Sequence, residues 1–110
     1  MNQIIEIKDN QFEQTVIKSS VNNIVLLKFW ANWCQPCKKM IPIFENIMIH
    51  YNNKIKIFSI NIENNTVITN KFYIRSIPTI LIFYKKNLIQ QHSGFLSENQ
   101  IKSMIDKHLI

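Results

Sequence analysis

Glycine is almost absent from this chain, since its 110 residues include only Gly94. A dinucleotide-binding fingerprint needs several glycines in one strand-to-helix turn, so no bound dinucleotide cofactor is expected. Cysteine is scarce as well, with only Cys34 and Cys37 present. Two cysteines this close together enclose too small a loop to staple a fold of this length. We therefore expect the pair to carry out chemistry rather than to add stability.

Arginine is also scarce, because Arg75 stands alone against 12 lysines in a chain of formal net charge +6. A basic chain can bind nucleic acid, but proteins that do so use arginine for bidentate contacts and gather their basic residues on one face. Here the lysines are scattered, and only Lys38–Lys39 and Lys85–Lys86 are adjacent. No nucleic-acid partner is expected.

Long apolar stretches are missing too. The longest, residues 77–84, has eight residues and contains a proline and a threonine, whereas a helix that spans a membrane needs about 20. Residues 1–10 carry two acids and a lysine instead of the apolar core of a secretory signal. We expect a cytoplasmic protein without a membrane partner.

The remaining composition, 46% apolar and 18% charged, is that of one ordinary globular domain over residues 1–110. Strands are predicted around residues 4–7, 24–30, 55–62, 80–84 and 88–92, and helices around 10–17, 38–50, 66–72 and 97–109. We expect Asp9 or Asn10 to cap the first helix, and Ser97 with Gln100 to form a capping box on the last. This alternation indicates an α/β sandwich with helices on both faces of a central sheet.

The cysteine pair follows a nearly continuous apolar run and opens a helix. Free backbone N–H groups and the helix dipole favour a thiolate at that place, so Cys34 is predicted to be the nucleophile. Cys37 lies one turn further and is predicted to resolve a mixed disulfide formed on Cys34. Lys38 and Lys39 are expected to add a small electrostatic effect.

Zinc binding is the main chemical alternative for a Cys-x-x-Cys sequence. A structural zinc ion needs two further ligands, and the three histidines of the chain are isolated from one another. No metal is expected.

Several short stretches accompany the pair, and together they give the whole chain its resemblance to the thioredoxin family. They are Phe29-Trp30-Ala31, Trp33-Cys34-x-Pro36-Cys37-Lys38, Pro42, Ile77-Pro78-Thr79 and Ser93-Gly94. The resemblance implies a five-stranded mixed sheet of order 3-1-2-4-5, with strands four and five antiparallel to the rest, flanked by four helices. It implies a protein-disulfide reductase without a bound cofactor, recycled by a separate thioredoxin reductase with electrons from NADPH.

The same resemblance implies how client proteins with disulfides are bound. Ile77–Pro78 is expected to be a cis peptide facing the pair, with the Ile77 backbone pairing with an extended substrate. The substrate-binding residues that it implies around Cys34 are Trp33, Gln35, Pro36, Ile77, Pro78, Gly94 and Phe95, with Trp30 beside them. A monomer is expected.

The chain departs from the family at several positions. Gln35 replaces a usual glycine, although Pro36 is kept and no histidine precedes Cys37, which favours a reducing role. Ser76 and Asn87 also replace glycines, and Asn87 is expected to be tolerated because asparagine accepts a positive φ in a turn.

Lys28 is the most informative departure. The family carries a buried aspartate there, behind the resolving cysteine, with a lysine nearby on the third strand; this chain has Lys28 and Ser59. A buried ammonium is costly, so Lys28 is expected to be neutral, to pair with thiolate character, or to reach water along its stem. As a neutral base or as a cation it would act on Cys37, and a Lys28 that only reaches water would have no catalytic role.

Two other functions stay open. The first is an oxidoreductase with a narrow set of clients or a more oxidising potential, and the departures at Gln35 and Lys28 are the reason to consider it. The second is a binding module that uses this fold to hold a partner protein without redox turnover. The intact pair of Cys34 and Cys37 argues against binding as the sole role.

Overall fold

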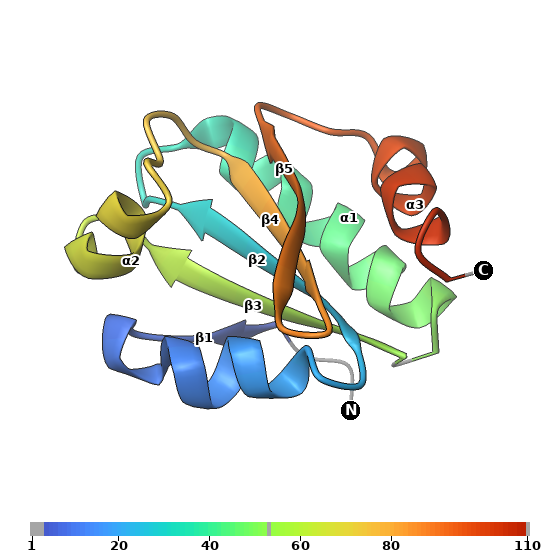
Figure 1. Cartoon of the computed structure of the whole chain (residues 1–110). Helices are drawn as coiled ribbons and strands as arrows, with labels where there is room; N and C mark the ends of the chain where they lie inside the picture. Colours follow the sequence, from blue (N-terminus) through green and yellow to red (C-terminus); the bar gives the residue numbers. More distant parts are fainter. Residues whose placement is uncertain (1–3, 53, 110) are drawn as a thin grey trace.

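A five-stranded sheet lies between two layers of helices in the computed structural model, which describes residues 4–52 and 54–109 (Figure 1). The elements in chain order are β1 (Ile5–Glu6), η1 (Asp9–Gln11), η2 (Glu13–Ile17), β2 (Ile24–Trp30), α1 (Gln35–His50), β3 (Ile55–Asn61), α2 (Thr66–Lys71), β4 (Thr79–Tyr84), β5 (Asn87–Ser93) and α3 (Glu98–Asp106). With η1 and η2 taken as one helical segment, the predicted mixed five-stranded sheet with four helices is confirmed.

The order of the strands differs from the expected 3-1-2-4-5, because the sheet runs β1-β3-β2-β4-β5. Both residues of β1 are exposed, which suits an edge strand, whereas β2 is buried along nearly its whole length and lies at the centre. The three strands β1, β3 and β2 are parallel. The apolar content of β2 therefore fixes its central place.

The expectation that strands four and five both oppose the rest was wrong for β5. β4 is antiparallel to β2, and β5 is antiparallel to β4. A tight hairpin joins β4 to β5 and reverses the chain a second time, so β4 alone opposes the other strands.

The two faces of the sheet are covered by different helices. α1 and α3 pack on one face, and η1, η2 and α2 pack on the other (Figure 1). Because side chains alternate along a strand, Leu26 of β2 joins the α1 layer while Val25 and Leu27 join the opposite layer. By the same alternation Lys28 faces α1.

Neither Asp9 nor Asn10 caps the first helix as expected, because the N-cap of η1 is Lys8, whose N–H donates to Gln11 Oε1 at 2.9 Å. The Asp9 carboxylate instead accepts from the backbone N–H groups of Val67, at 3.0 Å, and Ile68, at 2.9 Å. These are free donors in the first turn of α2, where an acidic side chain is stabilising. Asp9 thus ties the two helical segments of one layer together.

The β4–β5 hairpin turns at Lys85 and Lys86, whose φ angles are +51° and +70°. Both backbone N–H groups donate to Ser20, to its carbonyl oxygen at 2.6 Å and to its Oγ at 3.1 Å. Asn87 begins β5 and is not among the residues with positive φ, so the position expected for it in the turn was wrong. Two lysines occupy the left-handed region that two-residue hairpin loops require.

A glycine in place of Lys86 should relieve the strain of the positive φ and stabilise the protein. A left-handed conformation costs a non-glycine residue about 1–2 kcal/mol, and glycine loses about 0.5–1 kcal/mol of entropy on folding. We therefore expect Lys86→Gly to raise the free energy of unfolding by about 0.5–1 kcal/mol in urea titrations. Lys18→Gly is the matched control, because Lys18 has a helical φ of −62°, and it should lower that free energy by about 1 kcal/mol. A Lys86→Gly protein that is less stable than the parent would contradict the account.

Candidate functional site

Cys34 and Cys37 are joined by a disulfide at the start of α1, with 5.3 Å between their Cα atoms. Cys34 is the N-cap of the helix, and its Sγ accepts from the Cys37 backbone N–H at 3.2 Å. Both residues are buried. A helix N-terminus with a donor aimed at the sulfur stabilises negative charge there, so reduction of the disulfide places Cys34 where a thiolate is favoured.

Three loops meet beside this helix start because of the sheet register. Phe29 near the end of β2 pairs with Thr79, and Thr79 pairs with Ser93. The residues that precede Thr79 and those that follow Ser93 therefore lie at the edge where β2 leads into the cysteine pair. The Ile77–Pro78 peptide is cis.

Gly94 joins two of these loops, since its N–H donates to the Pro78 carbonyl oxygen at 2.8 Å. Its φ of +107° is a conformation that side chains rarely adopt. The only glycine of the chain is thus used at the predicted substrate-binding edge.

Aromatic surface is exposed around the pair. Trp33 is 64% exposed and Phe95 is 50% exposed, and Gln35 and Pro36 are also exposed. Trp33 and the half-buried Ile77 line one pocket of about 290 Å³, together with Ile62, Ile74, Arg75 and Ser76. The structure thus brings Trp33 and Ile77 together, and exposed apolar surface of this kind is typical of protein contacts.

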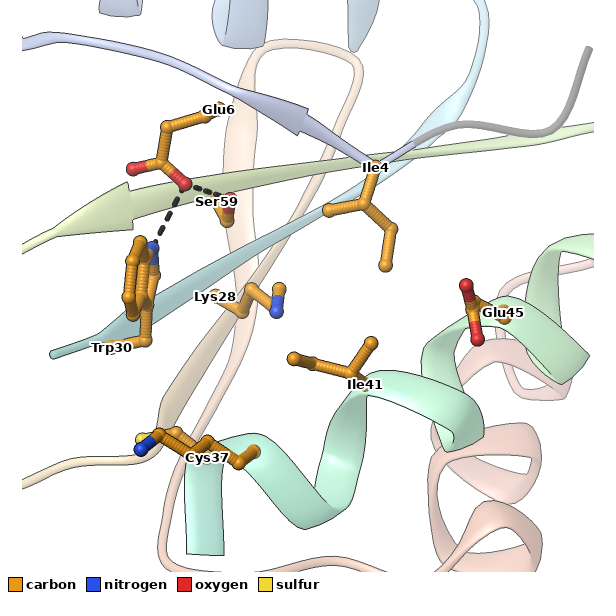
Figure 2. A pocket seen from close by; sticks show the side chains of 9 residues that line it. Ile4, Glu6, Lys28, Trp30, Cys37, Ile41, Glu45 and Ser59 are labelled. Carbon is orange, nitrogen blue, oxygen red and sulfur yellow. Dashed lines mark hydrogen bonds between the residues drawn. The ribbon is translucent and has the colours of Figure 1, made fainter. Parts of the chain in front are cut away.

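A larger pocket, of about 800 Å³, lies beside Cys37 between the sheet and α1 (Figure 2). Lys28 extends into it from β2 and is only 8% exposed. The other lining residues are Ile4, Glu6, Trp30, Lys38, Ile41, Glu45 and Ser59.

Burial lowers the pKa of Lys28 from its usual value, while the charges of Glu6 and then Glu45 act to raise it. The amine lies 5.2 Å from the centre of the Phe44 ring, a cation–π distance. Within residues 4–52 and 54–109, Lys28 forms no ion pair as close as 4.0 Å. Burial of the Lys28 ammonium therefore destabilises the folded protein, and the charges of Glu6 and Glu45 offset only part of that cost.

Glu6 is a site residue that the sequence reasoning missed. Its Oε1 accepts from Trp30 Nε1 at 2.9 Å and from Ser59 Oγ (Figure 2). The available signal was one acid between Ile5 and Ile7 in a short predicted strand, which could not show that this strand pairs with the strand of Ser59.

Other kinds of site find no support in the described part of the chain. No three His, Cys, Asp or Glu side chains gather there as metal ligands would. None of the helices there combines the length and the hydropathy that crossing a membrane requires.

Comparison with known proteins decides the family. A family model described as Thioredoxin matches residues 3–107. The chain belongs to the thioredoxin family. It is 39% identical to a thioredoxin of Buchnera aphidicola subsp. Schizaphis graminum, over 99% of both chains. It is 32% identical to a thioredoxin of Haemophilus influenzae, over 99% of this chain and 100% of the other. With its Cys34–Cys37 pair, this thioredoxin-family protein is a thiol–disulfide oxidoreductase with reductase function.

The buried amine generates a prediction about stability and pH. Because the pKa of Lys28 is lower in the folded protein than in the unfolded chain, the unfolded chain binds more protons between the two values. The cost of burying the charge is thus fully present below the folded pKa and is relieved as pH rises toward 10.5. We expect Lys28→Met to raise the free energy of unfolding of the oxidised protein by about 1–2 kcal/mol at pH 7.

The gain in the free energy of unfolding of Lys28→Met should shrink as the pH approaches 10. Urea unfolding over a pH series measures it. Lys56→Met is the control, since Lys56 lies on the neighbouring strand with its side chain exposed. A gain for Lys28→Met that is independent of pH would contradict the account.

Proposed function

We propose that this protein reduces disulfides of client proteins, with Cys34 as the nucleophile and Cys37 as the resolving thiol. The observation that carries the proposal is the place of Cys34 as N-cap of α1, with the Cys37 N–H directed at its sulfur. A nucleophile needs the lower thiol pKa of the two, and the helix start supplies the positive end of the dipole.

The exchange proceeds in two steps. The Cys34 thiolate attacks one sulfur of the client disulfide, forms a mixed disulfide and releases the first client thiolate, which takes up a proton. The Cys37 thiol then loses its proton and attacks Cys34 Sγ, which releases the second client thiolate. The client gains two electrons and two protons, and the pair returns to the disulfide seen here.

The surface that binds clients in this proposal surrounds the pair. Trp33 and Phe95 offer exposed aromatic contact. In this proposal the backbone of the half-buried Ile77 pairs with an extended client segment. Gly94 and Pro78 hold the two neighbouring loops together, and Gln35 and Pro36 complete the rim as exposed residues of the first turn of α1. Aromatic anchors of this type carry much of the binding energy in protein interfaces.

Recycling requires a separate electron donor. We propose that a thioredoxin reductase supplies the electrons from NADPH, and that this protein works without a bound cofactor as a monomer. The cytoplasm suits the role, because its thiol systems keep most protein thiols reduced.

Lys28 supports a second candidate, a more oxidising or narrow-client oxidoreductase. A cation in the pocket beside Cys37 favours the thiolate, and whatever stabilises the reduced pair raises its reduction potential. In either candidate we propose that Lys28 tunes the resolving thiol.

Single-cysteine variants test the assignment of the two thiols. Cys37→Ser should accumulate a mixed disulfide with a protein substrate such as insulin, because nothing resolves the intermediate on Cys34. Cys34→Ser should accumulate at most about a tenth as much under the same conditions, since the remaining thiol lacks the helix-start position. Both variants should lose turnover with NADPH and a thioredoxin reductase.

The measurement is mass spectrometry of the trapped adducts, with the double variant as the blank. Equal trapping by the two single variants would contradict the proposed roles, and turnover by either single variant would contradict the two-step exchange.

A further inference from the structure

Three polar residues in register lie on the face of the sheet that α1 covers. Glu6 on β1 is in register with Ser59 on β3, and Ser59 is in register with Lys28 on β2. Two residues earlier along β2 and β3, Leu26 pairs with Ile57, and both belong to the apolar core. All three residues line the pocket that Cys37 also lines, so an acid on the edge strand and an amine on the central strand share one cavity (Figure 2).

The carboxylate of Glu6 is held in a defined place. The Trp30 indole N–H and the Ser59 hydroxyl both donate to its Oε1. Glu6 is an exposed residue, yet these two hydrogen bonds fix the position of its carboxylate next to β3 and the end of β2.

The surroundings of Lys28 leave few groups to stabilise its charge. From α1 it faces the Phe44 ring, Glu45, Cys37 and the cation Lys38; from the sheet it faces Ser59, Glu6 and the apolar Ile80. Glu6 supplies the larger of the two favourable charge interactions, and Glu45 supplies the other.

We propose that Glu6 is a further positioning residue for thiol–disulfide exchange, which from the edge strand holds Lys28 as a cation beside Cys37. The inference rests on the proposed role of Cys37 as the resolving thiol. When the Cys37 thiol gives up its proton to water in the pocket, the ammonium of Lys28 stabilises the thiolate that attacks Cys34 Sγ. Glu6 touches none of the reacting atoms and acts only through Lys28.

The primary test is the titration of the Lys28 side chain in the oxidised protein, followed by NMR of lysine labelled with carbon-13. The Lys28 resonance is identified by its loss in Lys28→Met. Glu6→Gln should lower the midpoint of Lys28 by about half a pH unit or more, because a nearby opposite charge shifts a pKa by that order. Ser59→Ala should lower it by less, since the acid remains but loses one donor. Glu63→Gln is the control, an exposed acid outside the pocket lining, and should leave the midpoint unchanged.

The second test is the pH profile of the resolving step, measured as the second phase of a single turnover with an aromatic disulfide. The rate should fall at high pH as Lys28 loses its proton, and Glu6→Gln should move this fall to lower pH by the amount found for Lys28. Lys28→Met should remove it.

The outcomes separate this inference from the proposed function. An unchanged midpoint of Lys28 in Glu6→Gln would overturn the role inferred for Glu6. A shifted midpoint with an unchanged pH profile of the resolving rate would also overturn that role. The NMR titration needs no turnover, so it stands even if the trapping of mixed disulfides assigns the two thiols the other way round.

Discussion

The central position of β2 determines where the reactive pair lies. This strand is buried from Ile24 to Phe29, so it takes the middle of the sheet between β3 and β4. The chain leaves its end and turns directly into α1, which makes Cys34 the N-cap of a helix packed on the same sheet. The sulfur thus gains a helix start on a rigid support, and rigid elements hold reacting groups more accurately than loops do.

The register of the same strand assembles the rest of the site. Phe29 pairs with Thr79, and Thr79 pairs with Ser93. The cis Ile77–Pro78 peptide and Gly94 therefore lie at the end of the sheet where β2 leads into the cysteine pair. Two stretches far apart in sequence thereby border one helix start. The loops carry exposed residues such as Trp33 and Phe95, and the buried strands set their positions.

Burial also accounts for the unusual chemistry around Lys28. An amine at the centre of the sheet loses hydration, which lowers its pKa, and its compensation comes from carboxylates across a pocket and from an aromatic ring. Such a group lowers the stability of the fold. The amine lies in the pocket that Cys37 also lines, which is the placement on which the proposed role of Lys28 rests.

Much of this architecture follows from local sequence patterns. The strands and helices were predicted close to their observed bounds, and the capping box is confirmed, with Ser97 Oγ accepting from the Gln100 N–H at 3.2 Å. Which strand pairs with which is not a local property, so the order of the sheet, the direction of β5 and the pairing of Glu6 with Ser59 could not be obtained from periodicity. Asp9 was misassigned for the same reason, because its partners lie 58 and 59 residues away in the chain.

The most direct test of the account is the redox equilibrium of the Cys34–Cys37 pair in a series of glutathione buffers, read as the fraction of trapped thiols. A protein-disulfide reductase should show a midpoint well below the cytosolic glutathione poise, which is about −220 to −260 mV by extraction methods. A midpoint near or above that poise would contradict the reductase account, and would indicate that Gln35 and Lys28 have converted the pair to a more oxidising task.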